Sequence, residues 1–144
     1  MKTAELLEPE PVVALPANLR IKLPLGLLGF ERTKDYVLVS HEDFHPFFWL
    51  QFIDDPELAF PVVSPFVVMP HYQPDISPED ERFLGLESAE DALVLCVVTV
   101  RPEGDSTVNL RGPIVINRHT LAGKQIVPVN AARYALQYPL PTVE

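Results

Sequence analysis

The sequence lacks most features that mark a secreted or membrane protein. A single cysteine, Cys96, excludes an intramolecular disulfide, so nothing indicates an oxidising compartment. Residues 1–16 contain three glutamates and no apolar run of signal-peptide length. No other segment has the roughly 18 consecutive apolar residues of a membrane-spanning helix. We therefore expect a cytoplasmic protein that does not bind membranes.

Catalytic signatures are equally scarce. The six glycines occur singly and form neither a phosphate-binding G-x-x-x-x-G-K-[ST] loop nor a dinucleotide-binding G-x-G-x-x-G turn, and G-x-S-x-G is absent. Cys96 stands in the apolar run LVLCVVTV, which predicts a buried small hydrophobic residue rather than a nucleophile. Asp54 and Asp55 precede Pro56, where aspartate commonly caps a turn. We expect neither an enzyme nor a cofactor.

One segment, HEDFHP at residues 41–46, does match a catalytic pattern. In H-E-x-x-H, two histidines one helical turn apart bind zinc while the glutamate activates water. That geometry requires an α-helix, but a strand-like YVLVS precedes the segment and Pro46 disfavours helical backbone at His45. The segment therefore predicts an exposed polar turn. A zinc-dependent hydrolase that uses His41, Glu42 and His45 is the alternative function.

Basic residues are few, since 11 lysines and arginines stand against 20 acids, for a formal net charge of −9. Direct binding of nucleic acid is not expected, because nucleic acid attracts clustered basic side chains. The charge is uneven: residues 42–57 hold five acids and no base, 73–91 seven acids and one arginine, and 109–133 four bases and no acid. Separate acidic and basic surfaces would fit this pattern, and an acidic surface favours a basic protein partner. Ordinary solvated faces are the simpler alternative.

Hydrophobic residues are abundant, at 47% of the chain, and occur in short β-rich runs separated by proline, glycine or aspartate. The connections are mostly too short and polar for the crossover helices of a parallel sheet. We predict a mostly β fold: a single-domain antiparallel small β-sandwich or open barrel over residues 19–144, after a loose N-terminal arm at residues 1–18. The predicted strands are residues 19–23, 36–40, 47–52, 60–69 (FPVV and FVVM), 93–100, 110–117 and 124–129.

One short helix is predicted near residues 77–84. Ser77 suits the N-cap position, Pro78 suits the first turn, and the acidic residues that follow complement the positive end of the helix dipole. Phe83 and Leu84 are expected to turn toward the core.

Five phrases occur together, in this order: LPLGLLGFE (23–31), PFFWLQFIDDPELAFPVVSPF (46–66), YQPDIS (72–77), NLRGPIVIN (109–117) and GKQIV (123–127). In this set the chain resembles the FliW family of flagellar assembly factors over residues 19–140. The resemblance implies a small cytoplasmic β protein that binds newly made flagellin and, when flagellin is scarce, the RNA-binding translational repressor CsrA. Binding of CsrA would relieve repression of flagellin translation. We expect a monomer when the protein is free of partners.

Most residues of these phrases are expected to be structural, because glycines and prolines make turns and alternating apolar residues fill the core. Partner contacts are predicted at loop ends. The predicted partner-binding residues are Phe52, Ile53, Asp54, Asp55, Asn109, Leu110, Arg111, Gln125 and Ile126. No residue is predicted to be catalytic or to bind metal.

Large apolar residues near one turn suggest where a helix would bind. Phe47, Phe48, Phe52 and Ile53 lie close together in sequence, and an alternating strand cannot point all of them into one core. We expect some of them to be exposed and to form a groove for the amphipathic terminal helices of flagellin.

Overall fold

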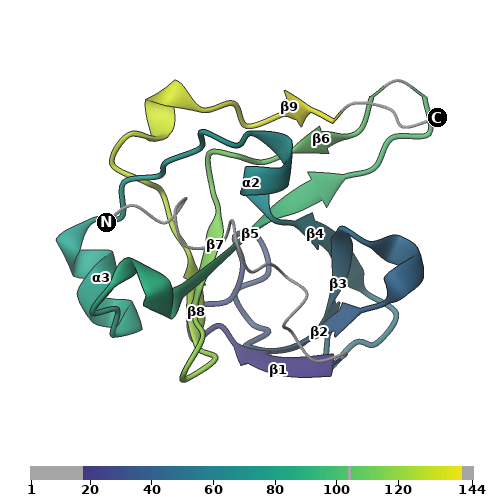
Figure 1. Ribbon diagram of the computed structural model, residues 1–144. Helices are drawn as coiled ribbons and strands as arrows, with labels where there is room; N and C mark the ends of the chain where they lie inside the picture. Colours follow the sequence, from purple (N-terminus) through teal and green to yellow (C-terminus); the bar gives the residue numbers. More distant parts are fainter. Residues whose placement is uncertain (1–17, 104, 141–144) are drawn as a thin grey trace.

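Nine strands form one sheet in which every described strand pair is antiparallel (Figure 1). The computed structural model describes residues 18–103 and 105–140. The strand order is β1-β2-β3-β4-β5-β6-β9, and β7 pairs with both β5 and β8. The strands are β1 (Asn18–Lys22), β2 (Asp35–Ser40), β3 (Phe47–Phe52), β4 (Ala59–Val63), β5 (Ala92–Thr99), β6 (Thr107–Val108), β7 (Ile114–Asn117), β8 (Gly123–Gln125) and β9 (Tyr138–Pro139). The predicted mostly antiparallel β fold is confirmed.

The sheet curls until β1 approaches β8, which makes it an open barrel. The backbone N–H of Lys22 donates to the carbonyl of Leu121 at 3.0 Å, and Lys22 forms an isolated parallel bridge with Ala122, directly before β8. The long strand β5 makes this curl possible because it changes partners along its length, pairing successively with β7, β4 and β6.

Two apolar cores lie on opposite faces of β5. Leu93 and Leu95 pack inside the barrel with residues of β1, β2, β3 and β7. Val94 and Cys96 pack on the other face, in a core that α2 (Pro65–Val68), α3 (Pro78–Leu84), β6 and β9 cover. A strand buried on both faces needs apolar residues at successive positions, which explains the unbroken run of apolar residues in β5.

The helix predicted near residues 77–84 is confirmed as α3. The hydroxyl of Ser77 accepts from the N–H of Asp80 at 3.1 Å, and Gly85 ends the helix with a left-handed φ of 70°. Leu84 is buried as predicted, but the prediction for Phe83 is wrong, because its side chain is 47% exposed. A helix of seven residues presents one narrow stripe to the core, and Leu84 occupies that stripe.

The strand predicted through residues 66–69 is also wrong, because α2 forms there. Four apolar residues in a row have no period that separates a strand from a helix. The cap decides the outcome: the hydroxyl of Ser64 accepts from the N–H of Phe66 at 3.3 Å, and Pro65 occupies the first turn.

The remaining differences concern element ends. β7 begins at Ile114 instead of residue 110, and β8 ends at Gln125 instead of residue 129. β6 and β9 have two residues each, too few to carry a period in the sequence. Residues 1–17 of the predicted arm lie outside the described residues, and Asn18 begins β1. Among the residues described, no helix is long and apolar enough to cross a membrane.

Candidate functional site

A groove of about 360 Å³ opens between the loop that follows β1 and the chain around β8. Three of the five phrases meet in it. Its lining comprises Leu25, Gly26, Leu27, Leu28 and Glu31 from the first phrase, Asn109, Arg111 and Gly112 from the fourth, Lys124, Gln125, Ile126 and Val127 in and after the fifth phrase's strand, and Leu136. Segments about 100 residues apart in sequence therefore build one surface.

The first wall is the loop at residues 24–31, and its sequence dictates its shape. Gly26 has a left-handed φ of 70°, and a Cβ there would lie 2.6 Å from the Cα of Glu31, so only glycine fits. Leu27 is 3% exposed and anchors the loop in the barrel core, whereas the next residue, Leu28, is 82% exposed. The loop thus holds one leucine inward and presents the other to solvent at the groove rim.

The opposite wall is a turn at residues 109–112 backed by β8. The side-chain carbonyl of Asn109 accepts from the N–H groups of Arg111 and Gly112 at 3.0 and 2.9 Å, which closes the turn. The side-chain amide of Gln125 then donates to the carbonyl of Gly112 at 3.1 Å, while its oxygen accepts from the N–H of Leu28 at 3.0 Å. Gln125 therefore connects both walls.

The rim of the groove is apolar. Leu25, Leu28, Val127 and Leu136 are 51%, 82%, 74% and 53% exposed. Solvent-facing leucine and valine side chains gathered around one depression are typical of a surface that buries apolar groups of a partner.

The charged groups of the groove are few and mostly engaged. Lys124 forms an ion pair with the buried Asp80 at 2.5 Å. The guanidinium Nε of Arg111 donates to the carbonyl of Tyr134 at 3.1 Å. Neither arrangement resembles an acid–base pair or a nucleophile with its base.

The structure brings some predicted partner-binding residues together and separates others. Four of them line the groove: Asn109, Arg111, Gln125 and Ile126. Ile53, Asp54 and Asp55 lie instead at the turn between β3 and β4, where both aspartates are exposed and Ile53 is half-buried.

The loop after β1 links the two places. The ring of Phe30 packs edge-on against Phe52 and Phe60, with centroid distances of 5.4 and 5.3 Å. The hydroxyl of Thr33 lies 3.4 Å from a carboxylate oxygen of Asp54. The β3–β4 turn is therefore adjacent to the loop that forms the first wall of the groove.

Three predicted contact residues belong to the core. Phe52, Leu110 and Ile126 are 2%, 0% and 1% exposed, so their side chains pack within the fold. Phe52 ends a strand whose alternation points it into the barrel. Leu110 and Ile126 instead pack into the second core. Ile126 also lines the groove, and a contact of these three residues with a partner stays a prediction.

The apolar surplus at the start of β3 is also explained by the two cores. Phe48 is 4% exposed inside the barrel, and its neighbour Phe47 packs against the second core. Both faces of the strand have apolar neighbours, so Phe48 and Phe52 are buried, whereas Phe47 and Ile53 are half-buried. A flagellin-binding groove at this turn stays a prediction. The sequence did not predict the exposed residues of the groove rim. Three of them, Leu25, Leu28 and Val127, lie in the first and fifth phrases, and Leu136 lies in none of the five.

The H-E-x-x-H segment does not form the helix that its chemistry needs. Residues 42–44 are a 3-10 turn, η2 (Glu42–Phe44), and His41 and His45 on either side are exposed. Across residues 18–103 and 105–140, no group of three or more histidine, cysteine or acidic side chains could hold a metal ion. The zinc-dependent hydrolase therefore has no support.

Cys96 is a buried core residue, as predicted. It is 0% exposed, and burial raises the pKa of its thiol well above the ordinary value. Because the thiolate is the nucleophilic form, a thiol held protonated in the core cannot serve as a nucleophile.

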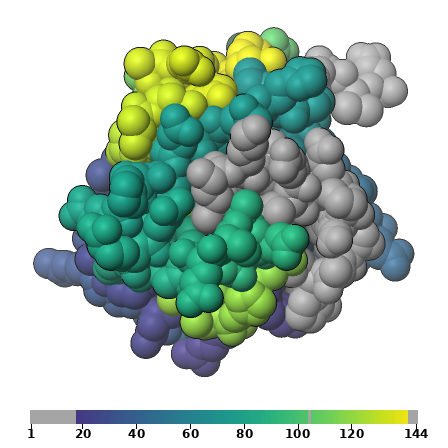
Figure 2. Space-filling view, turned by 60° about the vertical axis from the view of Figure 1, so that its left-hand side comes forward, coloured from purple at the N-terminus to yellow at the C-terminus, as the bar shows by residue number. Residues whose placement is uncertain are grey.

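The acidic stretch 73–91 and the basic stretch 109–133 do not form separate surfaces. Asp80 pairs with Lys124, and a carboxylate oxygen of Asp91 lies 2.9 Å from Nε2 of His119. Figure 2 shows this face, on which the lime-green segment around β8 meets the green segment after α3. The exposed acids of the β3–β4 turn remain as a separate acidic surface, formed by Asp54, Asp55 and Glu57.

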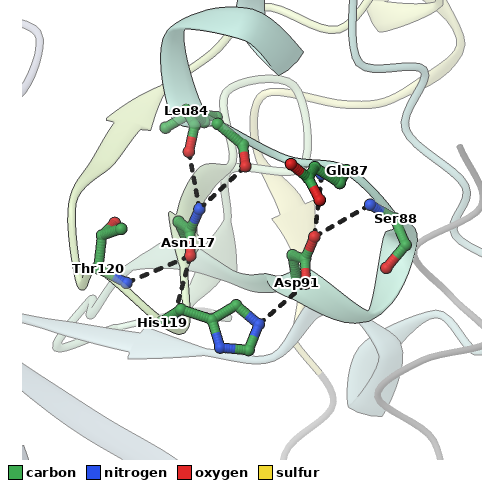
Figure 3. Close-up of polar contacts among 8 residues, drawn as sticks. Leu84, Glu87, Ser88, Asp91, Asn117, His119 and Thr120 are labelled. Atoms are coloured by element: carbon green, nitrogen blue, oxygen red, sulfur yellow. Dashed lines mark hydrogen bonds and ion pairs between the residues drawn. The ribbon is translucent and has the colours of Figure 1, made fainter.

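Asn117, the last residue of the phrase NLRGPIVIN, has a side-chain amide that also bonds to two separate segments (Figure 3). Asn117 is 4% exposed, and its Nδ2 donates to the carbonyls of Leu84 and Gly85 at 2.8 and 3.3 Å. Its Oδ1 accepts from the N–H groups of His119 and Thr120 at 2.8 and 3.3 Å. The side chain thus joins the end of α3 to the β7–β8 turn and has a structural role.

Comparisons with known proteins agree on one family. The family model described as FliW protein matches residues 11–140. The flagellar assembly factor FliW of Geotalea uraniireducens is 42% identical over 120 residues, which cover 83% of this chain and 72% of that protein. The FliW of Caldicellulosiruptor bescii is 39% identical over 116 residues, covering 80% and 75%. A crystal structure of the flagellar assembly factor FliW matches with a TM-score of 0.76 and 32% identity, over 85% of this chain and 86% of that one.

Proposed function

The chain belongs to the FliW family of flagellar assembly factors, and on that premise we propose that it binds flagellin and the translational repressor CsrA as alternative partners. In this proposal the protein acts in the cytoplasm. It captures CsrA when flagellin is scarce and releases it when flagellin accumulates, so that translation of flagellin resumes. It needs no cofactor and does not contact RNA itself, since its net charge of −9 opposes RNA binding.

The observation that carries this proposal is the convergence of three family phrases on one apolar-rimmed groove. Leu25, Leu28 and Val127 are each more than half exposed in this groove. A role in folding alone does not explain apolar side chains gathered on the surface, whereas a role in partner binding does. An amphipathic helix, such as the terminal segments of flagellin, would bury its apolar stripe on this rim.

The acidic surface at the β3–β4 turn suits the other partner. The family resemblance implies that CsrA is a small basic protein. Asp54, Asp55 and Glu57 are exposed, and residues 42–57 contain no lysine or arginine. Because this turn is joined to the groove through Phe30 and Thr33, a ligand on one surface lies close to the other.

The test is the binding of monomeric flagellin to a Leu28→Asp variant, measured by titration calorimetry. Leu28 is 82% exposed, so the variant should unfold at the same temperature as the unaltered protein. A charge placed in an apolar contact should weaken binding at least about tenfold, because burying one large apolar side chain contributes about 1.5 to 3 kcal/mol. Val100→Asp is the matched control, since Val100 is 66% exposed and does not line the groove; it should bind normally.

Ile53→Asp, at the β3–β4 turn, locates the flagellin surface within the same series. The proposal expects Leu28→Asp to lose more affinity for flagellin than Ile53→Asp does. A folded Leu28→Asp variant with normal affinity, beside an Ile53→Asp variant that no longer binds, would place the flagellin site at the turn and overturn the assignment of the groove.

A further inference from the structure

We propose that Gln125 is a positioning residue whose side-chain amide bridges the two walls of the groove and thereby fixes Leu28 where a partner meets it. The effect on binding rests on the function proposed above, whereas the bridge itself can be tested on the protein alone.

Both ends of the Gln125 side chain are in use. Its oxygen accepts from the backbone N–H of Leu28 at 3.0 Å, across 97 positions of sequence, and its nitrogen donates to the carbonyl of Gly112 at 3.1 Å. Because the amide oxygen and nitrogen both form hydrogen bonds within the protein, the side chain is less able to bond to a partner. Its contacts instead connect the 24–31 loop to the 109–112 turn.

The bridge is the direct hydrogen bond that ties the 24–31 loop to the facing wall, within the described part of the chain. Two backbone bonds within this loop are local: Gly26 N–H donates to the carbonyl of Leu23, and Phe30 N–H donates to that of Leu27. Leu27 is anchored in the core, but Leu28 is the most exposed of the described large apolar side chains. Without Gln125, the backbone at Leu28 keeps its turn but loses its attachment to the opposite wall.

The 109–112 turn, which supplies the acceptor for the Gln125 amide, is itself held by hydrogen bonds. Asn109 closes the turn that orients the Gly112 carbonyl toward Gln125. A Cβ added at Gly112 would lie 3.4 Å from Nε2 of Gln125 and 3.2 Å from Nδ2 of Asn109, so both side-chain amides lie directly beside the backbone of this turn. Asn109, Gln125 and Leu28 thus form one chain of contacts from the fourth phrase through the fifth to the first.

Only a side chain with both a donor and an acceptor at this length can make the bridge. Gln125→Met has a similar size and makes neither bond. Gln125→Glu keeps an acceptor for Leu28 but places a carboxylate oxygen against the Gly112 carbonyl, where two acceptors repel.

Hydrogen exchange followed by NMR tests the bridge in the free protein. In Gln125→Met the amide of Leu28 should exchange at least about fivefold faster, while the amides of Gly26 and Phe30 keep their protection. Unchanged exchange at Leu28 would overturn the proposal.

A double-mutant cycle on flagellin binding tests the consequence. Leu28→Ala and Gln125→Met should each weaken binding, by about tenfold and about fivefold, and the double variant should be no weaker than Leu28→Ala within about twofold. Such non-additivity is expected if Gln125 acts through Leu28. Additive losses would show that Gln125 touches the partner directly, and an unaltered affinity in Gln125→Met would show that the bridge is irrelevant to binding; either result overturns the proposal.

Gln125→Ala provides a second route if Gln125→Met does not fold. Alanine also lacks both the donor and the acceptor of the bridge, so Leu28 exchange and flagellin affinity should change in the same direction as in Gln125→Met. Should the unaltered protein bind no flagellin, the proposed function fails, yet the exchange of the Leu28 amide still confirms or overturns the bridge.

Discussion

At the residue scale, single side-chain amides hold together segments that are remote in sequence. Gln125 joins two loops at the groove, and Asn117 joins α3 to the β7–β8 turn. The two differ in burial: Asn117 is 4% exposed, whereas Gln125 is half-buried at the groove wall. A buried polar group that loses its partner cannot form a hydrogen bond with water instead. Removal of the Asn117 amide should therefore lower stability more than removal of the Gln125 amide.

Asn117→Ala should therefore act on stability. The change strips partners from the N–H of His119 and from the carbonyl of Leu84, and we expect a loss of about 2 to 3 kcal/mol in the free energy of unfolding, measured by urea denaturation. Asn117→Asp keeps the acceptor for His119 and Thr120 and removes only the donor, so it separates the two halves of the network. A loss below about 0.5 kcal/mol in Asn117→Ala would contradict the structural role.

At the element scale, short elements are held by caps and by contacts with neighbours. The 3-10 turn η3 (Ala89–Asp91) leads into β5, and its Asp91 carboxylate accepts from the N–H groups of Glu87 and Ser88 at 2.9 and 3.0 Å. The other carboxylate oxygen faces His119. These donors, the two backbone N–H groups first, lower the pKa of Asp91 below its ordinary value of 3.8.

This shift predicts a pH dependence of stability. Because the pKa of Asp91 is lower in the folded than in the unfolded protein, its stabilisation is complete above the unfolded pKa and is lost as pH falls through the folded one. Asp91→Asn should unfold at a lower temperature than the unaltered protein at pH 5, and the difference in Tm should shrink as pH falls below about 4. Thermal unfolding of both proteins across this range is the measurement. A difference as large at pH 3 as at pH 5 would contradict the assignment.

At the scale of the whole molecule, charge and apolar surface are distributed unequally. Two acids of residues 73–91 have partners on the same face: Asp80 forms an ion pair with Lys124, and Asp91 lies within hydrogen-bond distance of His119. The β3–β4 turn keeps its acidic character, and the groove supplies the apolar surface next to it. Exposed charges of this kind mainly set the rate at which a charged partner associates.

Association with CsrA should accordingly depend on salt. Raising the ionic strength to 0.15 M shortens the screening length to about 8 Å and should slow association noticeably in stopped-flow or surface-binding kinetics. The triple change Asp54→Asn, Asp55→Asn and Glu57→Gln should remove most of this dependence. As a control on another surface, the double change Glu79→Gln and Glu81→Gln on α3 should retain it. Salt-independent association of the unaltered protein would argue against steering by the acidic turn.

Several features of this protein follow from the sequence alone, because their causes are local. The apolar run around Cys96 predicts a buried strand, and Ser77 with Pro78 predicts the start of α3. Pro46 after His45 shows that the zinc-like segment is no helix, as the 3-10 turn at Glu42–Phe44 confirms. The five phrases indicate the family, which the comparisons show.

Other features depend on how distant segments meet, and only the tertiary structure decides them. Phe47 and Phe48 both pack against apolar neighbours because the protein has a second core, and the pattern of one strand does not predict a second core. Leu28 is exposed while Leu27 is buried because of the shape that Gly26 gives the loop and because the N–H of Leu28 bonds to Gln125, 97 positions away. A side chain's burial depends on what packs against it from elsewhere in the chain, so the phrases identify the segments that matter, whereas the curl of the sheet brings three of them to one groove.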